Sequence, residues 1–232
     1  MKMTKDDKQR ELESMLITRN FEVNDMLLSD ILEERAGEQV IKGRKIEGHP
    51  AVFDSMTSIG GWYNEIIERG AFDDCDFDDV LFFVNHETRK IPLARSRRNN
   101  KNSTMRLKVD KTGLFIGANL DTENNSEASQ LCSSIDRGDI TGMSFMFRVK
   151  EQKWENLDTP VPTRRILKIS KVYEVSAVNQ PAYEKTDISA RDKEALENAK
   201  LELENARSQE LDNSRALEIE KLKIQILLKS EV

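Results

Sequence analysis

Turn-forming residues are concentrated in the middle of this 232-residue chain, and this limits how the chain can fold. All five prolines and nine of the ten glycines lie between residues 40 and 188, among short β-branched and aromatic runs. Short apolar runs separated by turn-forming residues are typical of antiparallel strands joined by turns. We therefore predict three regions: a helical N-terminal arm at 1–39, a central domain at 40–188 and a charged C-terminal helix at 189–232.

Six strands and one helix are predicted in the central domain. The strands cover residues 40–53, 79–86, 104–110, 113–120, 142–149 and 165–178, and the helix covers 126–139. Asp110–Gly113 is expected to join two strands into a hairpin. The N-terminal arm is assigned to amphipathic helices because its apolar residues recur at roughly helical spacing. These are Met15, Leu16, Leu27, Leu28, Ile31 and Leu32.

The fold class predicted from these elements is α+β. We expect a β-rich, small and partly closed antiparallel barrel that is flanked by helices and extended by helices at both ends. The seven-residue spacing of leucines in the C-terminal helix is interrupted at Glu210, which favours a solvated helix over a coiled coil.

Composition argues against several classes of protein. Charged residues make up 34% of the chain against about 25% in typical domains, so part of it is expected to be solvated rather than core. The net charge of −6 disfavours a general nucleic-acid binder, which needs a basic face. Cys75 and Cys132 are too far apart to suggest a zinc knuckle or a disulfide framework. No signal peptide or membrane span is expected, and a reducing interior fits best.

Only two histidines, His49 and His86, could act as a base. His49 precedes Pro50 at an expected strand bend and is interpreted as structural. His86 ends the apolar strand VLFFVNH. An imidazole at a strand end is held by the sheet and open to a cleft, which suits a general base.

Ser144 lies in the strand GMSFMFRV. Because side chains alternate along a strand, Phe145 and Phe147 are expected to fill the core and the serine hydroxyl to lie on the other face. A serine is a weak nucleophile unless a base is within hydrogen-bond reach, and His86 is the candidate.

Glu174 interrupts the apolar run KVYEVSAV, where a carboxylate is costly unless it is paired. It is our candidate for orienting the imidazole, and Asp139 and Glu87 remain alternatives. The acidic stretch at 73–79 is interpreted as a solvated loop, because it lacks the glycine and the final acidic ligand of a calcium-binding loop.

Five segments occur in order between residues 48 and 186: GHPAVFD, ERGAFDDCDFDDVLFFVNHE, KVDKTGLFIGANL, RGDITGMSFMF and VYEVSAVNQPAYEKT. In combination they resemble the prohead proteases of tailed bacteriophages, distant relatives of the herpesvirus assemblins. The resemblance implies a serine endopeptidase with His86 as base, Ser144 as nucleophile and Glu174 as third member, and no cofactor. Met146 and Ala94 stand where the family often has glycine, which adds bulk near the site.

The resemblance also implies the biological setting. The expected substrates are the major capsid protein and the scaffold polypeptide, and self-cleavage is left open. The expected location is the viral procapsid in the host cytoplasm, and neither nucleic acid nor membrane is an expected partner. A homo-oligomer is left open. The alternative function is a non-catalytic capsid assembly or scaffolding factor with a protease-like barrel.

Stabilisation of the oxyanion is expected from backbone N–H groups or from an arginine. Arg148 shares the predicted Ser144 face, and Arg95, Arg164 and Arg165 remain open as alternatives.

Overall fold

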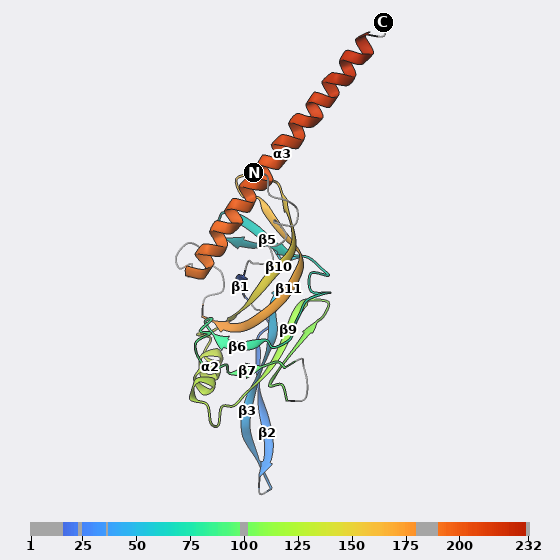
Figure 1. The fold of residues 1–232 in the computed structure, drawn as a ribbon. Helices are drawn as coiled ribbons and strands as arrows, with labels where there is room; N and C mark the ends of the chain where they lie inside the picture. The colour runs from blue at the N-terminus through green and yellow to red at the C-terminus, as the bar shows by residue number, and fades with distance from the viewer. Residues whose placement is uncertain (1–15, 23–24, 36, 98–101, 180–189, 231–232) are drawn as a thin grey trace.

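The computed structural model describes residues 16–22, 25–35, 37–97, 102–179 and 190–230, and Figure 1 shows their arrangement. The strands are β1 (Leu16–Glu22), β2 (Leu27–Arg35), β3 (Glu38–Val52), β4 (Thr57–Ile59), β5 (Tyr63–Ile67), β6 (Leu81–Val84), β7 (Ala94–Arg95), β8 (Met105–Val109), β9 (Gly113–Leu120), β10 (Gly142–Glu155) and β11 (Thr163–Val178). The helices are α2 (Ser126–Asp136) and α3 (Ala190–Ser230).

The described strands form two sheets. The larger sheet has the order β1-β10-β11-β5-β4, with β6 also paired to β11 and β7 paired to β6. The smaller sheet has the order β2-β3-β9-β8. Strand pairing within the described chain does not join these sheets, so the partly closed barrel predicted from the sequence is not confirmed. The predicted β-rich α+β character is confirmed.

Strand β11 organises the larger sheet. It pairs antiparallel with β10 along its length and parallel with β5 and β6 at two separate places. The pairing with β6 covers residues 174–177, which sets the end of β6 beside this part of β11. The sheet thereby brings together segments that are about a hundred residues apart in the chain.

One continuous hydrophobic cluster contains residues of both sheets and of helix α2. Phe145 and Phe147 of β10 lie in it with stacked rings, whose centroids are 4.4 Å apart, as the alternation of β10 predicts. Helix α2 adds Leu131 to the same cluster. Its N-terminus is capped by Asn125, whose side chain accepts hydrogen bonds from two backbone N–H groups.

The predicted helices of the N-terminal arm are wrong for residues 16–22 and 27–35, which form strands β1 and β2. Residues 1–15 lie outside the described residues. A shift of register between Ile31 and Leu32 in the β2–β3 pair explains the misleading pattern, because a bulge breaks the period of two. The boundary predicted between residues 39 and 40 falls inside β3.

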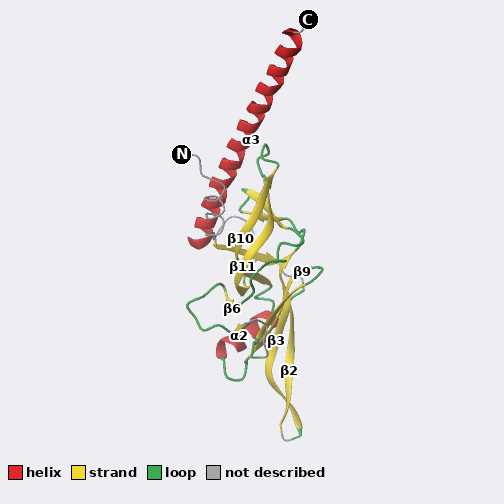
Figure 2. Cartoon of the chain, turned by 45° about the vertical axis from the view of Figure 1, so that its right-hand side comes forward, coloured by secondary structure: helices red, strands yellow, loops and turns green. Residues whose placement is uncertain are grey.

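The long helix α3 occupies most of the region for which the sequence predicts a charged helix. It is anchored by Arg164, a fully buried side chain that donates to Glu65 (3.1 Å) and lies 3.6 Å from Glu202 of α3. Ala199 and Leu203 of the helix are also buried. Figures 1 and 2 show that the C-terminal part of α3 extends beyond the sheets. Exposed aliphatic side chains on this part are Leu211, Leu217, Ile219, Leu222, Ile224 and Ile226.

Candidate active site

His86 is positioned by a tight turn at the end of β6. Asn85 and His86 both have positive φ angles, 48° and 58°, and the N–H of Glu87 donates to the carbonyl of Val84 (3.1 Å). Two consecutive residues in this conformation are typical of a type I′ turn, which is costly for residues other than glycine and asparagine. The N–H of His86 donates to the hydroxyl of Ser176 on β11 (3.2 Å), so the turn is fixed to the sheet.

Glu174 is a buried carboxylate that binds the imidazole of His86. Its side chain is only 2% exposed, and its Oε1 is hydrogen-bonded to Nδ1 of His86. Its other oxygen, Oε2, accepts from the hydroxyl of Ser176 (2.8 Å). An ionised carboxylate can only accept, so Nδ1 carries the proton and Nε2 is the basic nitrogen of the neutral ring. Glu174 is therefore paired rather than exposed to water.

Ser144 lies on β10, the strand next to Glu174. The register pairs Ser144 with Ser176, and Met146 with Glu174. Directly paired residues of antiparallel strands project from the same face with Cβ atoms about 4.5–5.5 Å apart. Ser144 therefore shares a sheet face with Ser176 and Glu174. It is fully buried, whereas the His86 side chain remains 20% exposed.

The structure places the alternative acids elsewhere. Asp139 is exposed and pairs with Arg137, two residues before it. Glu87 is exposed and pairs with Lys90. Of the three carboxylates considered from the sequence, Glu174 is therefore the one bound to His86.

Arg148 lies on β10, the strand of Ser144, and is the candidate arginine without an ion pair among the described residues. Its guanidinium lies 5.4 Å from the ring centre of Tyr173, and its buried Nε has no hydrogen-bond partner in the part of the chain that the structure describes. The other three candidates have carboxylate partners. Arg95 pairs with Asp79, Arg164 with Glu65 and Glu202, and Arg165 with Glu68 and Glu155.

The two positions that depart from the family pattern are both buried close to these strands. Met146 on β10 is 4% exposed and stands opposite Glu174, and Ala94 lies in β7, which pairs with β6. The methionine side chain therefore occupies space on the face that carries Ser144. Ser176, which bonds to both His86 and Glu174, is not singled out by the sequence. Its only signal is its position two residues after Glu174.

His49 on β3 belongs to a second, partly buried cluster. Its Nδ1 binds Asp25, its Nε2 lies 3.1 Å from Asp110, and its backbone N–H also donates to Asp25 (3.2 Å). Burial opposes the positive charge, but the hydrogen bonds to the two carboxylates outweigh it, so the pKa of His49 is raised. Burial alone would raise the pKa of Asp110, but hydrogen bonds from the backbone of Thr112 and from His49 lower it. These contacts agree with a structural role for His49.

The acidic loop at 73–79 is tied to basic side chains. Asp74 pairs with Lys168, and Asp76 pairs with Lys171. Across the described residues, no group of three or more His, Cys, Asp or Glu side chains could hold a metal ion.

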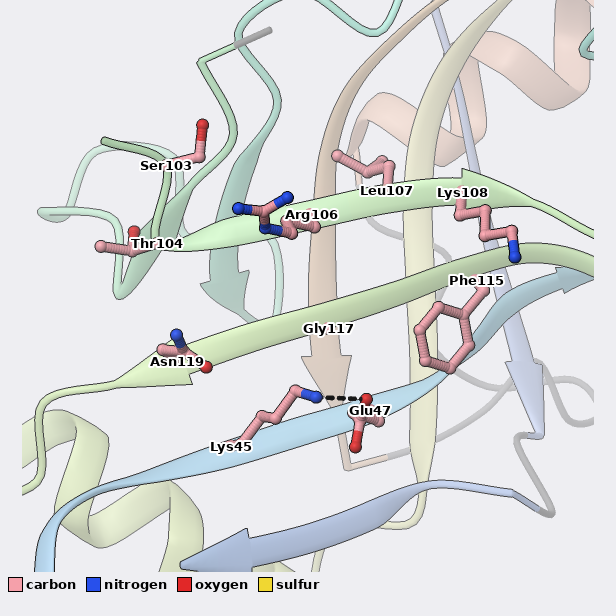
Figure 3. Close-up of a pocket in the computed structure, with 10 residues that line it drawn as sticks. All are labelled: Lys45, Glu47, Ser103, Thr104, Arg106, Leu107, Lys108, Phe115, Gly117 and Asn119. Atoms are coloured by element: carbon pink, nitrogen blue, oxygen red, sulfur yellow. Dashed lines mark ion pairs between the residues drawn. The ribbon is translucent and has the colours of Figure 1, made fainter. Parts of the chain in front are cut away.

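Figure 3 shows a separate groove of about 620 Å³ on the smaller sheet. Its lining residues are Lys45, Glu47, Ser103, Thr104, Arg106, Leu107, Lys108, Phe115, Gly117 and Asn119, which lie on or next to β3, β8 and β9. None of the residues around Ser144 contributes to it. This groove is therefore distinct from the site formed by β6, β10 and β11.

Comparisons with known proteins agree with the resemblance noted from the sequence. A solved structure of the bacteriophage T4 capsid assembly protease, gp21, is similar to this chain with a TM-score of 0.44 and 12% identity, covering 72% of this chain and 98% of that one. No curated protein sequence matches. No described helix is long and apolar enough to cross a membrane. The caudovirus prohead serine protease family matches residues 31–201, well over half of the sequence, and the chain therefore belongs to this family.

Proposed function

We propose that this protein is a serine endopeptidase that uses Ser144 as nucleophile, His86 as general base and Glu174 as the group that orients and stabilises the imidazole. The observation that carries the proposal is the buried Glu174–His86 pair on the sheet face that also bears Ser144. A carboxylate removed from water is costly unless it is paired, and here the pairing selects the tautomer that a general base needs.

The reaction is acyl transfer in two halves. Nε2 of His86 takes the hydroxyl proton while Oγ of Ser144 attacks the scissile carbonyl, and the imidazolium is stabilised by the Glu174 carboxylate. The tetrahedral intermediate collapses, the peptide C–N bond breaks, and His86 passes its proton to the leaving amine. Water then attacks the acyl-enzyme with His86 again as base, which releases the new carboxyl end and restores Ser144.

The oxyanion of each tetrahedral intermediate needs hydrogen-bond donors. Backbone N–H groups next to Ser144 and the side chain of Arg148 are the proposed donors. The support for Arg148 is its place on the strand of Ser144 and its buried Nε, which has no hydrogen-bond partner among the described residues. In a site that excludes water, a hydrogen bond from such a donor stabilises the oxyanion more strongly than it would on the surface.

We further propose that the enzyme acts on the major capsid protein and the scaffold polypeptide inside the procapsid, and that it also cleaves itself. Membership of the prohead protease family supports this setting. The exposed aliphatic side chains on the outer part of α3 support a role for this helix in recruitment to the shell, because such surfaces gain stability by packing on a partner.

Co-expression with the major capsid protein tests this function against the alternative of a non-catalytic assembly factor. We expect capsid truncation with the wild type and a loss of about 10³-fold or more in rate with Ser144→Ala or His86→Ala. Ser96→Ala removes another fully buried serine and is the matched control for folding. Normal processing by a well-folded Ser144→Ala variant would refute the serine mechanism and favour the assembly factor.

A further inference from the structure

Ser176 on β11 makes two hydrogen bonds that both bear on His86. Its hydroxyl oxygen accepts from the backbone N–H of His86 (3.2 Å), and the hydroxyl donates to Oε2 of Glu174 (2.8 Å). Glu174 binds Nδ1 of the same histidine through its other oxygen, Oε1. The three hydrogen bonds therefore form a closed ring, which starts at the backbone of His86 and returns to its imidazole.

The direction of each bond in this ring is fixed by the chemistry of its groups. An ionised carboxylate can only accept, and a backbone N–H can only donate. The single proton of the Ser176 hydroxyl must therefore point to Glu174, and one of its lone pairs must face the N–H of His86. A side chain at this position has to donate and accept at the same time, which a hydroxyl does and the methyl group of alanine cannot.

Burial makes these hydrogen bonds hard to replace. Ser176 is fully buried and Glu174 is 2% exposed. Because side chains alternate along a strand, residues 174 and 176 of β11 project from the same face, which Ser144 on the paired strand shares. Without the hydroxyl, a buried carboxylate oxygen would lose its donor, and a carboxylate is costly to bury without hydrogen bonds.

The backbone of His86 also needs support. Its φ angle of 58° lies in the left-handed region, which residues other than glycine adopt rarely unless their surroundings hold them there. The neighbouring Asn85 is fastened to β11 by other bonds, since its N–H donates to the carbonyl of Ala177 (2.9 Å) and its Oδ1 accepts from the N–H of Asn179 (3.3 Å). Loss of the Ser176 hydroxyl would therefore leave the turn attached to the sheet and loosen His86 within it.

We propose that Ser176 is a positioning residue of the serine protease site, which fixes the backbone and the imidazole of His86 together. It holds the backbone directly and the ring through Glu174, so that Nε2 stays in place to take the proton of Ser144. This inference rests on the proposed function. Because Ser176 acts through His86 and Glu174, it affects the rate of the chemical step and not the binding of substrate.

The kinetic test is Ser176→Ala in the full-length chain, assayed on denatured major capsid protein. We expect kcat to fall by at least about tenfold and KM to stay within about twofold of wild type, because a hydrogen bond to a buried charge is lost and no contact with substrate is. Ser96→Ala, at another fully buried serine, is the matched control and should leave kcat and KM unchanged. Ser176→Thr keeps the hydroxyl on a residue suited to strands and should restore kcat to within about threefold of wild type.

A second variant covers the case in which Ser176→Ala does not fold. Ser176→Cys keeps the shape of the side chain, but its thiol is only a weak donor. We expect a folded Ser176→Cys enzyme to have a kcat at least about tenfold below that of Ser176→Thr, and thermal unfolding shows which variants are folded.

Nuclear magnetic resonance reports how firmly His86 is held without any substrate. The chain has two histidines, so isotope-labelled histidine gives two sets of ring signals, and His49→Gln identifies those of His49. We expect the Nδ1 proton of His86 to exchange with water at least about tenfold faster in Ser176→Ala than in wild type, because its hydrogen bond to Glu174 opens more often. The ring signals of His49 should be the same in both proteins.

The outcomes separate this inference from the proposed function. Wild-type kcat and unchanged proton exchange in a folded Ser176→Ala variant would overturn the role of Ser176 and leave the protease intact. A loss of kcat that a folded Ser176→Thr variant does not restore, or one matched by an equal change in KM, would identify a merely structural role and overturn it as well. If the wild type neither cleaves denatured capsid protein nor reacts at Ser144 with a fluorophosphonate probe, the proposed function fails and this inference fails with it.

Discussion

The Glu174→Gln substitution is the most informative single change at the site, because it keeps the size of the side chain and removes its charge. Glu174 uses different oxygens for its two donors, Oε1 for His86 and Oε2 for Ser176. A glutamine has only one acceptor oxygen. If that oxygen bonds to Ser176, the amide N–H₂ faces Nδ1 of His86 and favours the tautomer with the proton on Nε2. That tautomer cannot take a proton from Ser144.

The loss of rate can be estimated from the charge alone. The carboxylate is buried and in contact with the ring that becomes an imidazolium in the transition state. Two unit charges about 4 Å apart attract by about 4 kcal/mol at an effective dielectric constant of about 20. At about 1.36 kcal/mol for each factor of ten, this corresponds to a decrease of about 10³-fold in kcat. The cost in stability should be smaller, about 1–3 kcal/mol, since one donor loses its partner while a buried charge is also removed.

The assay is single-turnover cleavage of denatured capsid protein, accompanied by thermal unfolding of the same samples. Glu151→Gln, which changes an exposed glutamate farther along β10, is the matched control and should leave both quantities unchanged. A Glu174→Gln enzyme that melts normally and cleaves within about threefold of wild type, against the expected factor of about 10³, would refute the assignment of Glu174 as the third member.

Three further predictions concern the stability of the fold and the accessibility of residues outside the site. The pair of His49 and Asp110 should stabilise the fold at pH values between the two shifted pKa values. The contribution of His49 is complete below its unfolded pKa and is lost as the pH rises through its raised folded pKa. The contribution of Asp110 is lost as the pH falls through its lowered folded pKa. The difference in melting temperature between wild type and His49→Gln, measured from about pH 4 to about pH 10, should therefore be largest near the middle of the range, and a constant difference would contradict this. Burial raises the pKa of the Cys75 thiol to about 12, so iodoacetamide at mildly alkaline pH should modify Cys75 far more slowly in the folded protein than in urea, as peptide mass spectrometry can show. Phe147→Ala should lower the free energy of unfolding by about 3–5 kcal/mol in urea titrations, whereas Val161→Ala at an exposed position should have little effect.

The sequence predicts the strands of the central domain well where local signals are strong. The Asp110–Gly113 turn does join β8 to β9, with the N–H of Asp110 donating to the carbonyl of Gly113 (2.9 Å). β1 is missed because its pairing partner, β10, is distant in the chain, and local spacing carries no information about this pairing. β2 pairs with the next strand, β3, and is missed because the bulge next to Ile31 shifts its apolar residues out of strict alternation.

The candidate site, too, can be predicted from the sequence only in part. The residue types and their strands can be chosen from the sequence, because a carboxylate within an apolar run and a histidine at a strand end are unusual. Their proximity cannot be predicted, since it depends on the parallel pairing of β6 with β11 across 93 residues of chain, for example Leu81 with Glu174. The burial of Ser144 is equally hidden, because it depends on tertiary structure that local sequence does not show.

The topology of the larger sheet also determines when the site can exist during synthesis. β11 is the last strand to leave the ribosome, and without it neither Glu174 nor the strand that joins β10 to β6 is present. A nascent chain that ends before residue 163 thus carries His86 and Ser144 on segments that β11 does not yet join. The site of the proposed protease is therefore incomplete until a late, long-range closure of the sheet, a slow kind of folding step. A partial chain without β11 would lack the complete proposed triad.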